Sequence, residues 1–483
     1  MIHRKIYPRP YSMTLRENFL ILRDSFALRV GSGLPEDVAE LFCELTGKFT
    51  AGTVKLELAY DPLLPAFCAA SGEAAAAVPE SGWSYTLSLD ERGAALNAND
   101  LNGLRYAFYT FLQLLQRRGE ESITGYAAPF CDIKDKPALK FRGFHICIFP
   151  DIPLETVKKL FEIAAFTKYN YAVVEQFGGF KLDTVHTWND VGCEKSEMAA
   201  LARRARTMGL EIIPMCNSLG HAIMGTDVLG KNMLLEANPQ LEPYLEPDGY
   251  DWCISNPAVP KLIRAMRHEL YELFGPGEYV HVGCDEAFFI GSCDRCASRP
   301  LIPMLSAYLN ELCAEVVSEG RRPIMWSDML LNQKDWTGGD TIYASATDDE
   351  LPTDRLLPEL DRRFVIADWQ YDAVTFPEPT SAYFKEQGFS TLLCSFKSEQ
   401  NIVNIARSAR AGGIDGVMLT LWTLVENIFP YVGPASMLIW GEDDKMPFQP
   451  TIITTDLLRK LCPSGGDYYK AGWMHSNMDR RLW

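Results

Sequence analysis

The chain has 483 residues and a formal net charge of −17, and its 47% hydrophobic and 23% charged residues are ordinary for a globular protein. This length suits two domains or one large barrel with an attached unit. The acidic excess argues against nucleic acid or an anionic membrane as the main partner. Composition leaves the assembly state open, a homo-oligomer included.

The N-terminal stretch "MIHRKIYPRPYSMTL" has basic residues but no apolar segment of the signal-peptide type, and no run of about 18 apolar residues could span a bilayer. The 13 cysteines are an odd and scattered set, and several lie inside apolar, strand-like runs (Cys147, Cys216 and Cys394). Buried, reduced cysteines are typical of a reducing compartment. We therefore expect a cytoplasmic protein without a signal peptide or membrane contact.

Residues 1–136 predict a small α+β domain. The stretch "TVKLELAY" predicts a strand, and "WSYTLSLDERGAALNAND" predicts two strands with a turn at residues 91–93. In "LNGLRYAFYTFLQLLQRRG", apolar residues recur at helical spacing and Gly119 follows as a stop signal. The alanine-rich stretch at residues 74–77 predicts a loop or a short helix.

From residue 137 onward, eight apolar runs alternate with amphipathic stretches such as residues 154–168 and 260–274. The runs are "FRGFHICIF", "NYAVVEQF", "LEIIPMCN", "YVHVGCDE", "RPIMWSD", "RFVIADWQY", "TLLCSF" and "GVMLTLW". Such alternation favours a parallel sheet covered by helices, and eight units predict a (β/α)8 TIM barrel. The structural alternative is a doubly wound open sheet, but no glycine-rich phosphate loop follows any run.

The sequence therefore predicts an α/β fold with three parts. These are the small domain at residues 1–136, the barrel at residues 137–442, and a C-terminal helix and tail at residues 443–483.

Polar and aromatic residues gather at the predicted strand ends, where a barrel of this kind builds its active site. They are Glu175, His221, the adjacent pair Asp285 and Glu286, Trp326, Asp328, Trp369, Tyr371 and Trp422, and Arg142 lies near the first strand. Aromatic rings can stack on the C–H faces of a sugar, while carboxylates bind hydroxyls or carry acid chemistry.

Each of these residues also has a structural alternative. A tryptophan at a strand end can be part of the packed core, and His221 can fill the core or cap a helix. Arg142 can join the two domains through a salt bridge. The acidic pair can cap the helix that follows, because acids favour helix N-termini.

Several motifs resemble one known family. "YVHVGCDE" resembles the His-x-Gly-x-Asp-Glu signature of family-20 glycoside hydrolases, the β-N-acetylhexosaminidases. "RGFHICI" resembles the first barrel strand with its sugar-binding Arg, and "GLEIIPMCNSLGHA" resembles the strand-three motif with Leu219 in place of a proline. "CISNPAVPKLI" is similar to the approach to strand four, and "YTLSLDERGAALNANDLNGLRYAFYTFLQLL" to the preceding small domain. The resemblance covers most of residues 84–426.

Two departures narrow this resemblance. The family's strand-two motif, His-x-Thr-Asp-Asp-Gln, is here "VVEQFGGF", so Glu175 stands where the family has an acidic pair. "HVGCDEAFFIGSCDRC", "MWSDML" and "CSFK" most resemble the intracellular hexosaminidase D branch. That branch implies a preference for galactosamine-type over glucosamine-type sugars.

The resemblance implies a retaining enzyme that removes terminal β-linked GalNAc or GlcNAc from a glycan. An ordinary retaining pair straddles the sugar roughly 5 Å apart, which adjacent residues cannot easily do, whereas substrate-assisted catalysis uses the acetamido group as nucleophile. Glu286 would then protonate the leaving oxygen, and Asp285 would hold the acetamido N–H.

The resemblance also assigns roles at the other strand ends. Arg142 would bind ring hydroxyls, and Tyr371 the acetamido carbonyl. His221 with Glu175 would tune Glu286. Trp326, Trp369 and Trp422 would pack against the sugar ring and its N-acetyl methyl group. Glu426 would contact the 4- or 6-hydroxyl, and Asp328 would also bind the sugar.

Two other functions stay open on the same fold. A non-catalytic carbohydrate-binding barrel would keep the tryptophans and lose an acid, whereas this chain has both acids. A metal-dependent hydrolase would need His or Asp ligands at strand ends, yet the seven histidines include no His-x-His pair. The single C-x-x-C of Cys293 and Cys296, with Cys284 nearby, favours structural thiols over zinc. We therefore expect no metal and no cofactor.

Overall fold

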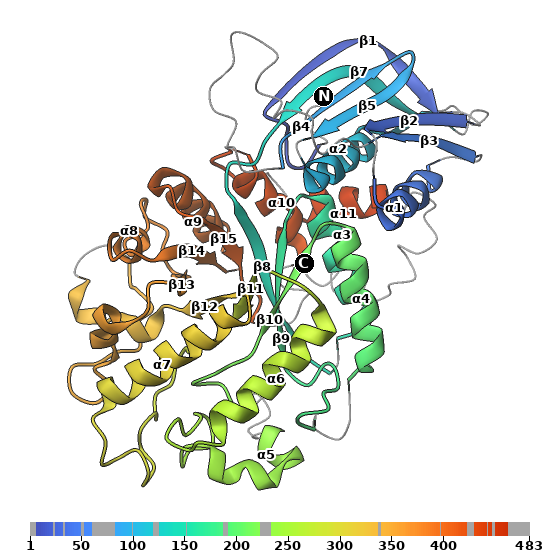
Figure 1. Ribbon diagram of the computed structural model, residues 1–483. Helices are drawn as coiled ribbons and strands as arrows, with labels where there is room; N and C mark the ends of the chain where they lie inside the picture. The colour runs from blue at the N-terminus through green and yellow to red at the C-terminus, as the bar shows by residue number, and fades with distance from the viewer. Residues whose placement is uncertain are drawn as a thin grey trace, which may run out of the picture.

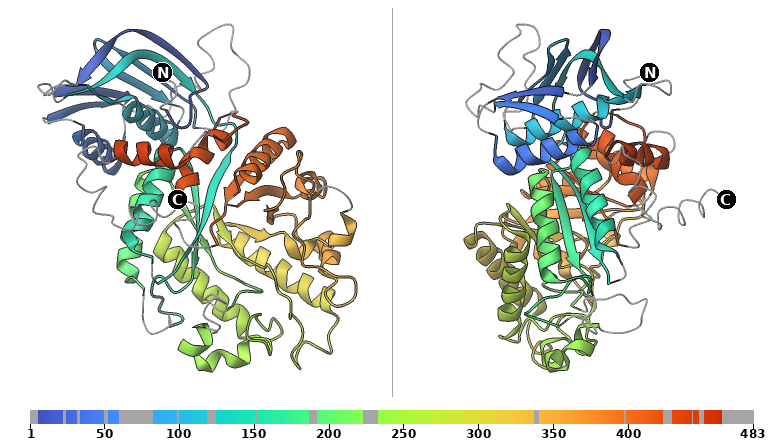
Figure 2. Two further views of the ribbon diagram at one scale, coloured as in Figure 1. Left: turned by 180° about the vertical axis from the view of Figure 1, so that it is seen from behind. Right: turned by 90° about the vertical axis from the view of Figure 1, so that its right-hand side faces the viewer.

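The computed structural model consists of a TIM barrel and a smaller sheet domain (Figures 1 and 2). Eight parallel strands close into a barrel in the order β10-β11-β12-β13-β14-β15-β8-β9, which confirms the predicted fold class. The structure describes residues 6–22, 25–31, 34–49, 53–59, 83–98, 100–118, 125–150, 152–186, 192–222, 233–336, 340–396, 398–422, 429–441, 443–446 and 450–461.

Each of the eight apolar runs forms one barrel strand. The strands are β8 (Phe141–Ile148), β9 (Tyr171–Gln176), β10 (Glu211–Met215), β11 (Tyr279–His281), β12 (Arg322–Trp326), β13 (Val365–Trp369), β14 (Ser390–Ser395) and β15 (Gly416–Leu419). Their residues are almost all buried because the barrel interior covers one face and helices cover the other.

Side chains alternate between these two faces along each strand. Phe141, Tyr171 and Tyr279 point inward and fill the N-terminal end of the barrel, with the centroids of the first two rings 4.5 Å apart. In β8, Phe144 and Ile146 belong instead to the large core beneath the outer helices.

Helices follow most of the strands. They are α3 (Leu154–Phe166), α4 (Lys195–Thr207), α5 (Met233–Ala237), η5 (Pro239–Tyr244), α6 (Val259–Phe274), α7 (Leu301–Ser318), α8 (Ser381–Glu386), α9 (Glu399–Gly412) and α10 (Phe429–Ile439). The predicted amphipathic stretches correspond to α3 and α6. Between β12 and β13 the helical elements among the described residues are three 3₁₀ turns, η6 (Asp328–Leu330), η7 (Gln333–Asp335) and η8 (Thr353–Glu359).

The small domain is a seven-stranded sheet with two helices. Its strands are β1 (Ser12–Leu22), β2 (Ser25–Gly31), β3 (Thr53–Ala59), β4 (Tyr85–Asp90), β5 (Gly93–Ala98), β6 (Gln116–Arg118) and β7 (Gly125–Asp135), and its helices are α1 (Glu36–Gly47) and α2 (Leu101–Leu114). The predicted hairpin is β4–β5. The prediction that α2 continues to Gly119 is wrong, because β6 leaves the helix to pair with β7. The alanine-rich stretch lies outside the described residues.

Helix α2 lies between the small sheet and the barrel (Figure 1). It begins after Asp100, whose carboxylate accepts the Gly103 N–H at 2.7 Å, as an N-cap does. On its barrel side, the Tyr109 hydroxyl donates to the Met208 carbonyl at 2.7 Å, just before β10 begins. The small domain therefore covers the N-terminal end of the barrel, and the opposite end carries the candidate site.

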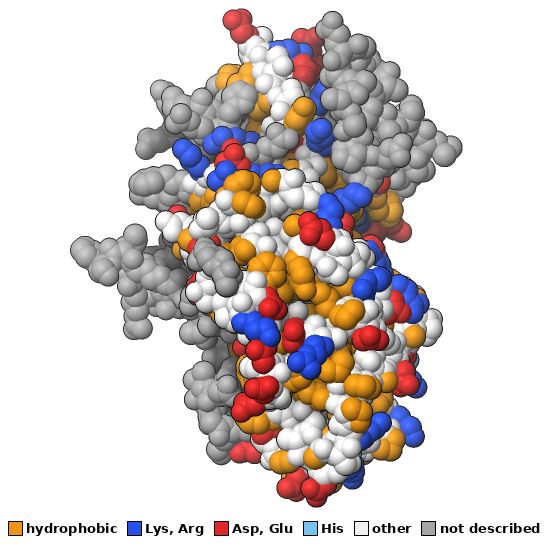
Figure 3. Space-filling view, turned by 90° about the vertical axis from the view of Figure 1, so that its left-hand side faces the viewer, with side chains coloured by type: hydrophobic (Ala, Val, Ile, Leu, Met, Phe, Trp, Pro, Cys, Tyr) orange, Lys and Arg blue, Asp and Glu red, His pale blue; other side chains and the backbone are white. Residues whose placement is uncertain are grey.

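The last described helix, α11 (Pro450–Leu461), packs against α10, α3 and α2. Among the described residues, no helix is both long enough and apolar enough to cross a membrane. On the face shown in Figure 3, acidic and basic side chains are intermingled.

Candidate active site

The acidic pair lies on an irregular segment that follows the three-residue strand β11. Gly283, Cys284 and Glu286 have φ values of 68°, 74° and 47°, in the left-handed region. Such conformations cost about 1–3 kcal/mol for a non-glycine residue and concentrate at functional sites. Here they bury Asp285, which is 4% exposed, and leave 37% of the Glu286 side chain exposed.

His221 joins the two acids. Its Nε2 lies 3.2 Å from Asp285 Oδ2 and 3.3 Å from Glu286 Oε2, and the Tyr250 hydroxyl lies 2.8 Å from its Nδ1. The other oxygen of Asp285, Oδ1, is buried and has no hydrogen-bond partner among the described residues. Since buried carboxylate oxygens normally accept hydrogen bonds, this atom is the natural acceptor for a polar group of a ligand.

The charge on His221 follows from these neighbours. Burial alone would lower the pKa of His221, but attraction to Asp285 and hydrogen bonds to Asp285 and Glu286 raise it well above its ordinary value. The imidazole is therefore protonated at neutral pH and offsets the negative charge of Asp285.

Asp328 holds the backbone of Glu286. Its Oδ2 accepts the Glu286 N–H at 2.9 Å and the Ser345 hydroxyl at 2.6 Å, and its Oδ1 accepts the indole N–H of Trp369 at 3.2 Å. Burial and then repulsion from Asp285 raise the pKa of Asp328 to about 7, against the lowering effect of these hydrogen bonds. This fully buried carboxylate fixes the main chain of one acid and the orientation of one tryptophan.

Glu175 lies at the end of β9 with both oxygens occupied. Its Oε1 accepts from Asn217 Nδ2 at 2.6 Å, and its Oε2 lies 3.1 Å from His145 Nε2 and 3.2 Å from Cys147 Sγ. The residue is 2% exposed. Glu175 is therefore a buried part of the site wall, with its acceptors used inside the protein.

Four aromatic rings lie at the same end of the barrel as the acids. The ring centroids of Trp326 and Trp422 are 5.3 Å apart, and those of Trp369 and Tyr371 are 5.1 Å apart. The indole N–H of Trp422 donates to the Tyr371 hydroxyl, which also contacts the Thr420 side chain and carries one proton of its own to donate. Burial raises the pKa of Tyr371 well above its ordinary value, so the phenol keeps this proton.

A second histidine at this end is neutral. His281 is fully buried, and burial followed by repulsion from His145 lowers its pKa well below the ordinary value. Its ring centroid lies 4.3 Å from that of Trp326. His281 therefore supports the tryptophan as a neutral ring, whereas His221 carries charge.

A sequence model described as "Glycosyl hydrolase family 20, catalytic domain" matches residues 152–423, more than half of the chain. The chain belongs to glycosyl hydrolase family 20. The matched segment runs from α3 to just beyond β15 and contains the acidic pair, His221 and the four site aromatics.

Curated relatives of this family-20 chain are distant. It is 24% identical over 386 residues to a β-hexosaminidase of Porphyromonas gingivalis, which covers 71% of this chain and 48% of the relative. It is 23% identical over 453 residues to a β-hexosaminidase of Emericella nidulans, and this match covers 78% of this chain and 72% of the relative. The chain thus spans about half the length of the first of these relatives.

Solved family-20 structures share the fold. An exo-β-N-acetylglucosaminidase from Vibrio harveyi superposes with a TM-score of 0.70 at 15% identity, covering 95% of this chain and 77% of that one. A β-N-acetylhexosaminidase from Bacteroides fragilis gives a TM-score of 0.67 at 16% identity, and the match covers 98% of this chain and 95% of that one.

The structure brings most of the predicted site residues together at the C-terminal end of the barrel. They are Glu175, His221, Asp285, Glu286, Trp326, Asp328, Trp369, Tyr371 and Trp422, linked by the contacts described above. Asp328 faces the protein rather than open space, because its oxygens hold the main chain of Glu286 and two side chains. Glu426 lies outside the described residues.

The prediction that Arg142 binds the sugar is wrong. Arg142 is the second residue of β8, at the end of the barrel opposite the acids, and it is fully buried. Its guanidinium donates to the carbonyls of Leu139, Lys140 and Lys168 at 2.7–3.0 Å and to the Tyr106 hydroxyl at 3.2 Å. Strand parity also points it outward, toward the small domain. Arg142 therefore joins the two domains, as the structural alternative proposed, but it does so through hydrogen bonds instead of a salt bridge.

Several site residues were missed by sequence reasoning. His145 and Cys147 share the inward parity of Phe141 and lie toward the C-terminal end of β8, so counting along that strand could have found them. Tyr250 contacts His221, and the ring of Tyr343 lies 4.9 Å from that of Trp369 and 5.6 Å from that of Tyr371. Both tyrosines come from irregular loops, where no periodicity marks them.

Proposed function

We propose that this family-20 chain is a retaining exo-β-N-acetylhexosaminidase that removes terminal β-linked GlcNAc or GalNAc by substrate-assisted catalysis. Family membership and relatives named β-hexosaminidase support the substrate class. The environments of the two acids support the mechanism.

In the first step, the acetamido carbonyl oxygen of the substrate attacks C1 while the bond from C1 to the leaving oxygen breaks. Glu286, which is partly exposed, donates its proton to that oxygen. Buried Asp285 accepts the acetamido N–H through Oδ1 and offsets the positive charge of the oxazolinium ion. In the second step, water attacks C1 while the bond from C1 to the acetamido oxygen breaks. Glu286 takes the proton of the water, and the acetamido group and the β configuration are restored.

The neighbouring acids argue against a protein nucleophile. Glu175 has both oxygens engaged by Asn217, His145 and Cys147. Asp328 is fully buried and engaged by Glu286 N–H, Ser345 and Trp369. Since a nucleophile needs an accessible lone pair, neither carboxylate suits attack on C1.

The aromatic residues suit the rest of the sugar. Trp369 and Trp422 offer apolar faces to the pyranose ring and the N-acetyl methyl group. Trp326 is fully buried, with its ring centroid 5.3 Å from that of Trp422, so it supports that ring from inside the protein and does not contact the sugar as predicted. The Tyr371 phenol is placed among them to donate to the acetamido oxygen. This donor would orient the carbonyl for attack.

The observation that carries the proposal is the buried, unpartnered Oδ1 of Asp285 beside the partly exposed Glu286. The test compares aryl β-N-acetylhexosaminides of the GlcNAc and GalNAc series with the matching glucoside and galactoside. We expect turnover of the acetamido substrates and almost none of the hydroxyl substrates. The GlcNAc to GalNAc ratio then reports the sugar preference, which we expect to favour GalNAc.

Two variants extend the test. Asp285→Asn should lower kcat by about two to three powers of ten, the effect of removing one preorganised electrostatic partner. Glu286→Gln should lose turnover of substrates with basic leaving groups while it spares activated aryl glycosides. Equal rates on acetamido and hydroxyl substrates, or a glycosyl ester trapped on a protein carboxylate, would refute the mechanism. A folded chain that binds the sugar without turnover would identify a binding barrel.

A further inference from the structure

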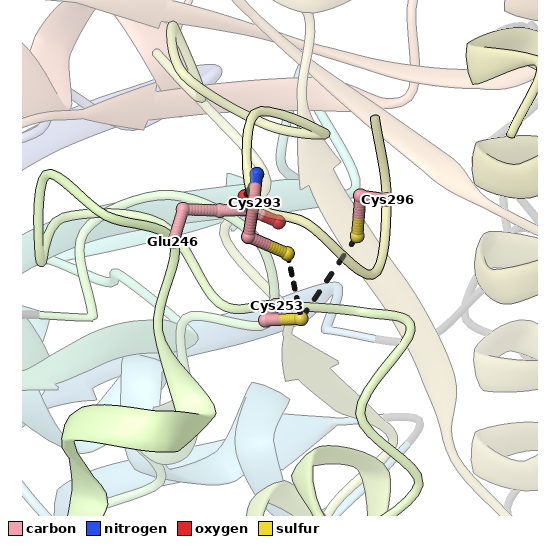
Figure 4. Close-up of side chains that lie close together, drawn as sticks. All are labelled: Glu246, Cys253, Cys293 and Cys296. Atoms are coloured by element: carbon pink, nitrogen blue, oxygen red, sulfur yellow. Dashed lines mark hydrogen bonds between the residues drawn. The ribbon is translucent and has the colours of Figure 1, made fainter. Parts of the chain in front are cut away.

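A cluster of three cysteines and one glutamate lies beside the candidate active site and takes no part in the proposed reaction. Figure 4 shows Cys253, Cys293 and Cys296 with their sulfur atoms converging, and Glu246 against them. One ligand atom from each of the four residues lies within 4.8 Å of every other. Only the Cys293–Cys296 pair was visible in the sequence, because Glu246 and Cys253 come from an earlier loop.

The spacing of the sulfur atoms suits a small tetrahedral ion. Cys253 Sγ lies 3.3 Å from Cys293 Sγ and 3.9 Å from Cys296 Sγ. Bonds of about 2.3 Å from zinc to sulfur imply a tetrahedron with edges of roughly 3.8 Å, between thiolates of the same ion.

Glu246 adds a fourth ligand with an unused oxygen. The residue is 2% exposed, and its Oε2 accepts the Cys293 N–H at 2.6 Å. Its Oε1 is buried and has no hydrogen-bond partner in the described part of the chain. A buried carboxylate oxygen without a donor is costly, and a cation would remove that cost.

We propose that Glu246, Cys253, Cys293 and Cys296 bind one structural zinc ion. Three sulfurs and one carboxylate suit zinc, while magnesium and calcium prefer all-oxygen ligands. Four protein ligands also close the coordination sphere, which is typical of structural rather than catalytic zinc. A single disulfide between Cys253 and Cys293 would leave Cys296 and the free Glu246 oxygen unexplained.

The ion would join the two loops that carry the acid–base groups. Glu246 and Cys253 lie on the connection between β10 and α6, which also carries His221 and Tyr250. Cys293 and Cys296 lie on the loop that begins with the acidic pair. Asp251 Oδ2 already accepts the Phe289 N–H across these loops at 2.8 Å, so zinc would reinforce an existing contact.

The first experiment is elemental analysis of the full chain, purified reduced and without a histidine tag. We expect about one zinc ion per chain, the number that a single four-ligand site holds. The Cys253→Ser and Cys296→Ser chains should each contain at least about tenfold less zinc than wild type, because each variant lacks one thiolate ligand. Cys43→Ser is the matched control, since Cys43 is an exposed free thiol on α1 and should leave the zinc content unchanged.

A second readout keeps the proposal testable where a cysteine variant folds poorly. Glu246→Gln keeps an acceptor for the Cys293 N–H but removes the charged ligand, so it should fold and bind zinc more weakly. Cobalt-substituted wild type should show thiolate-to-cobalt charge-transfer absorption, reduced in Glu246→Gln. The proposal would be overturned by a wild-type chain that folds without metal, or by a zinc content that stays unchanged in Cys253→Ser and Cys296→Ser. A Cys253–Cys293 disulfide in the freshly reduced chain would also overturn it.

Discussion

Asp328 acts on the chemistry through hydrogen bonds that only a carboxylate can make together. An asparagine has one acceptor oxygen and would turn its NH₂ toward either Trp369 or the Glu286 N–H, which are both donors. We expect Asp328→Asn to lower kcat by about 10²-fold, the scale for misplacing a catalytic group by about 1 Å. KM should change less, because Asp328 is fully buried.

The control for Asp328→Asn is Ser345→Ala, which removes one donor and leaves the carboxylate in place. We expect this variant to retain most of its kcat. The assay is steady-state kinetics on an aryl β-N-acetylhexosaminide. Wild-type kcat in Asp328→Asn would exclude the positioning role.

His221 makes the stability of the fold depend on pH. Its pKa in the folded chain is raised well above the unfolded value of 6.5, chiefly by Asp285 once burial is overcome. A raised pKa contributes stability that is complete below pH 6.5 and is lost as pH rises through the folded value. The free energy of unfolding of wild type should therefore exceed that of His221→Gln most at low pH, and the gap should shrink as pH rises.

Urea unfolding of wild type and His221→Gln across this pH range measures the gap. The same comparison in an Asp285→Asn background is the control, because it removes the leading cause of the raised pKa. The pH dependence of the gap should then be much smaller. A gap that grows with pH in the wild-type background would reverse the sign argued here.

Close approach between two loops explains a glycine just before His221. A Cβ on Gly220 would lie 2.3 Å from the Asp285 carbonyl oxygen and 3.2 Å from the Ala287 nitrogen, both of them backbone atoms. We expect Gly220→Ala to displace the acidic pair, with a loss of kcat on the order of 10²-fold. Overpacking should also lower the free energy of unfolding by about 1–3 kcal/mol.

Gly47→Ala is the matched control for Gly220→Ala. Gly47 ends α1, and a Cβ there would meet nothing within 4 Å. Steady-state kinetics and thermal unfolding compare the two variants. Gly220→Ala should have the lower kcat and the lower unfolding temperature. Equal kcat in both would show that the loop absorbs the added methyl without moving Asp285.

The elements of the barrel were predictable because their signal is local. Strands buried on both faces are nearly continuous apolar runs, and this pattern located all eight. The ends and directions of the strands decide the site, and that is where Arg142 was misplaced. Residues such as Tyr250, Cys253 and Glu246 reach the site region from irregular loops. Their positions depend on long-range packing, which no short sequence window contains.

At the scale of the whole molecule, a buried polar cluster joins the small domain to the barrel. Lys168 Nζ lies 2.7 Å from Asp135 Oδ2 and donates to the Tyr85 hydroxyl at 2.8 Å, and the side chains of the ion pair are fully buried. The Trp440 indole donates to Asp135 Oδ1 at 3.0 Å. The small domain and the barrel thus share one buried ion pair at the end of the barrel opposite the acids.

This cluster predicts an asymmetry between single and double variants. Lys168→Met leaves the Asp135 carboxylate buried without its cation and should lower the free energy of unfolding by about 3–5 kcal/mol. Adding Asp135→Asn removes the unpaired charge, so the double variant should be more stable than Lys168→Met alone. Lys158→Met is the control, because its pair with Glu155 is exposed and worth about 0–1 kcal/mol. Urea unfolding measures the free energy of unfolding of Lys168→Met, of the double variant and of Lys158→Met. A Lys168→Met chain as stable as Lys158→Met, or a double variant less stable than the single one, would show that the buried pair does not hold the domains together.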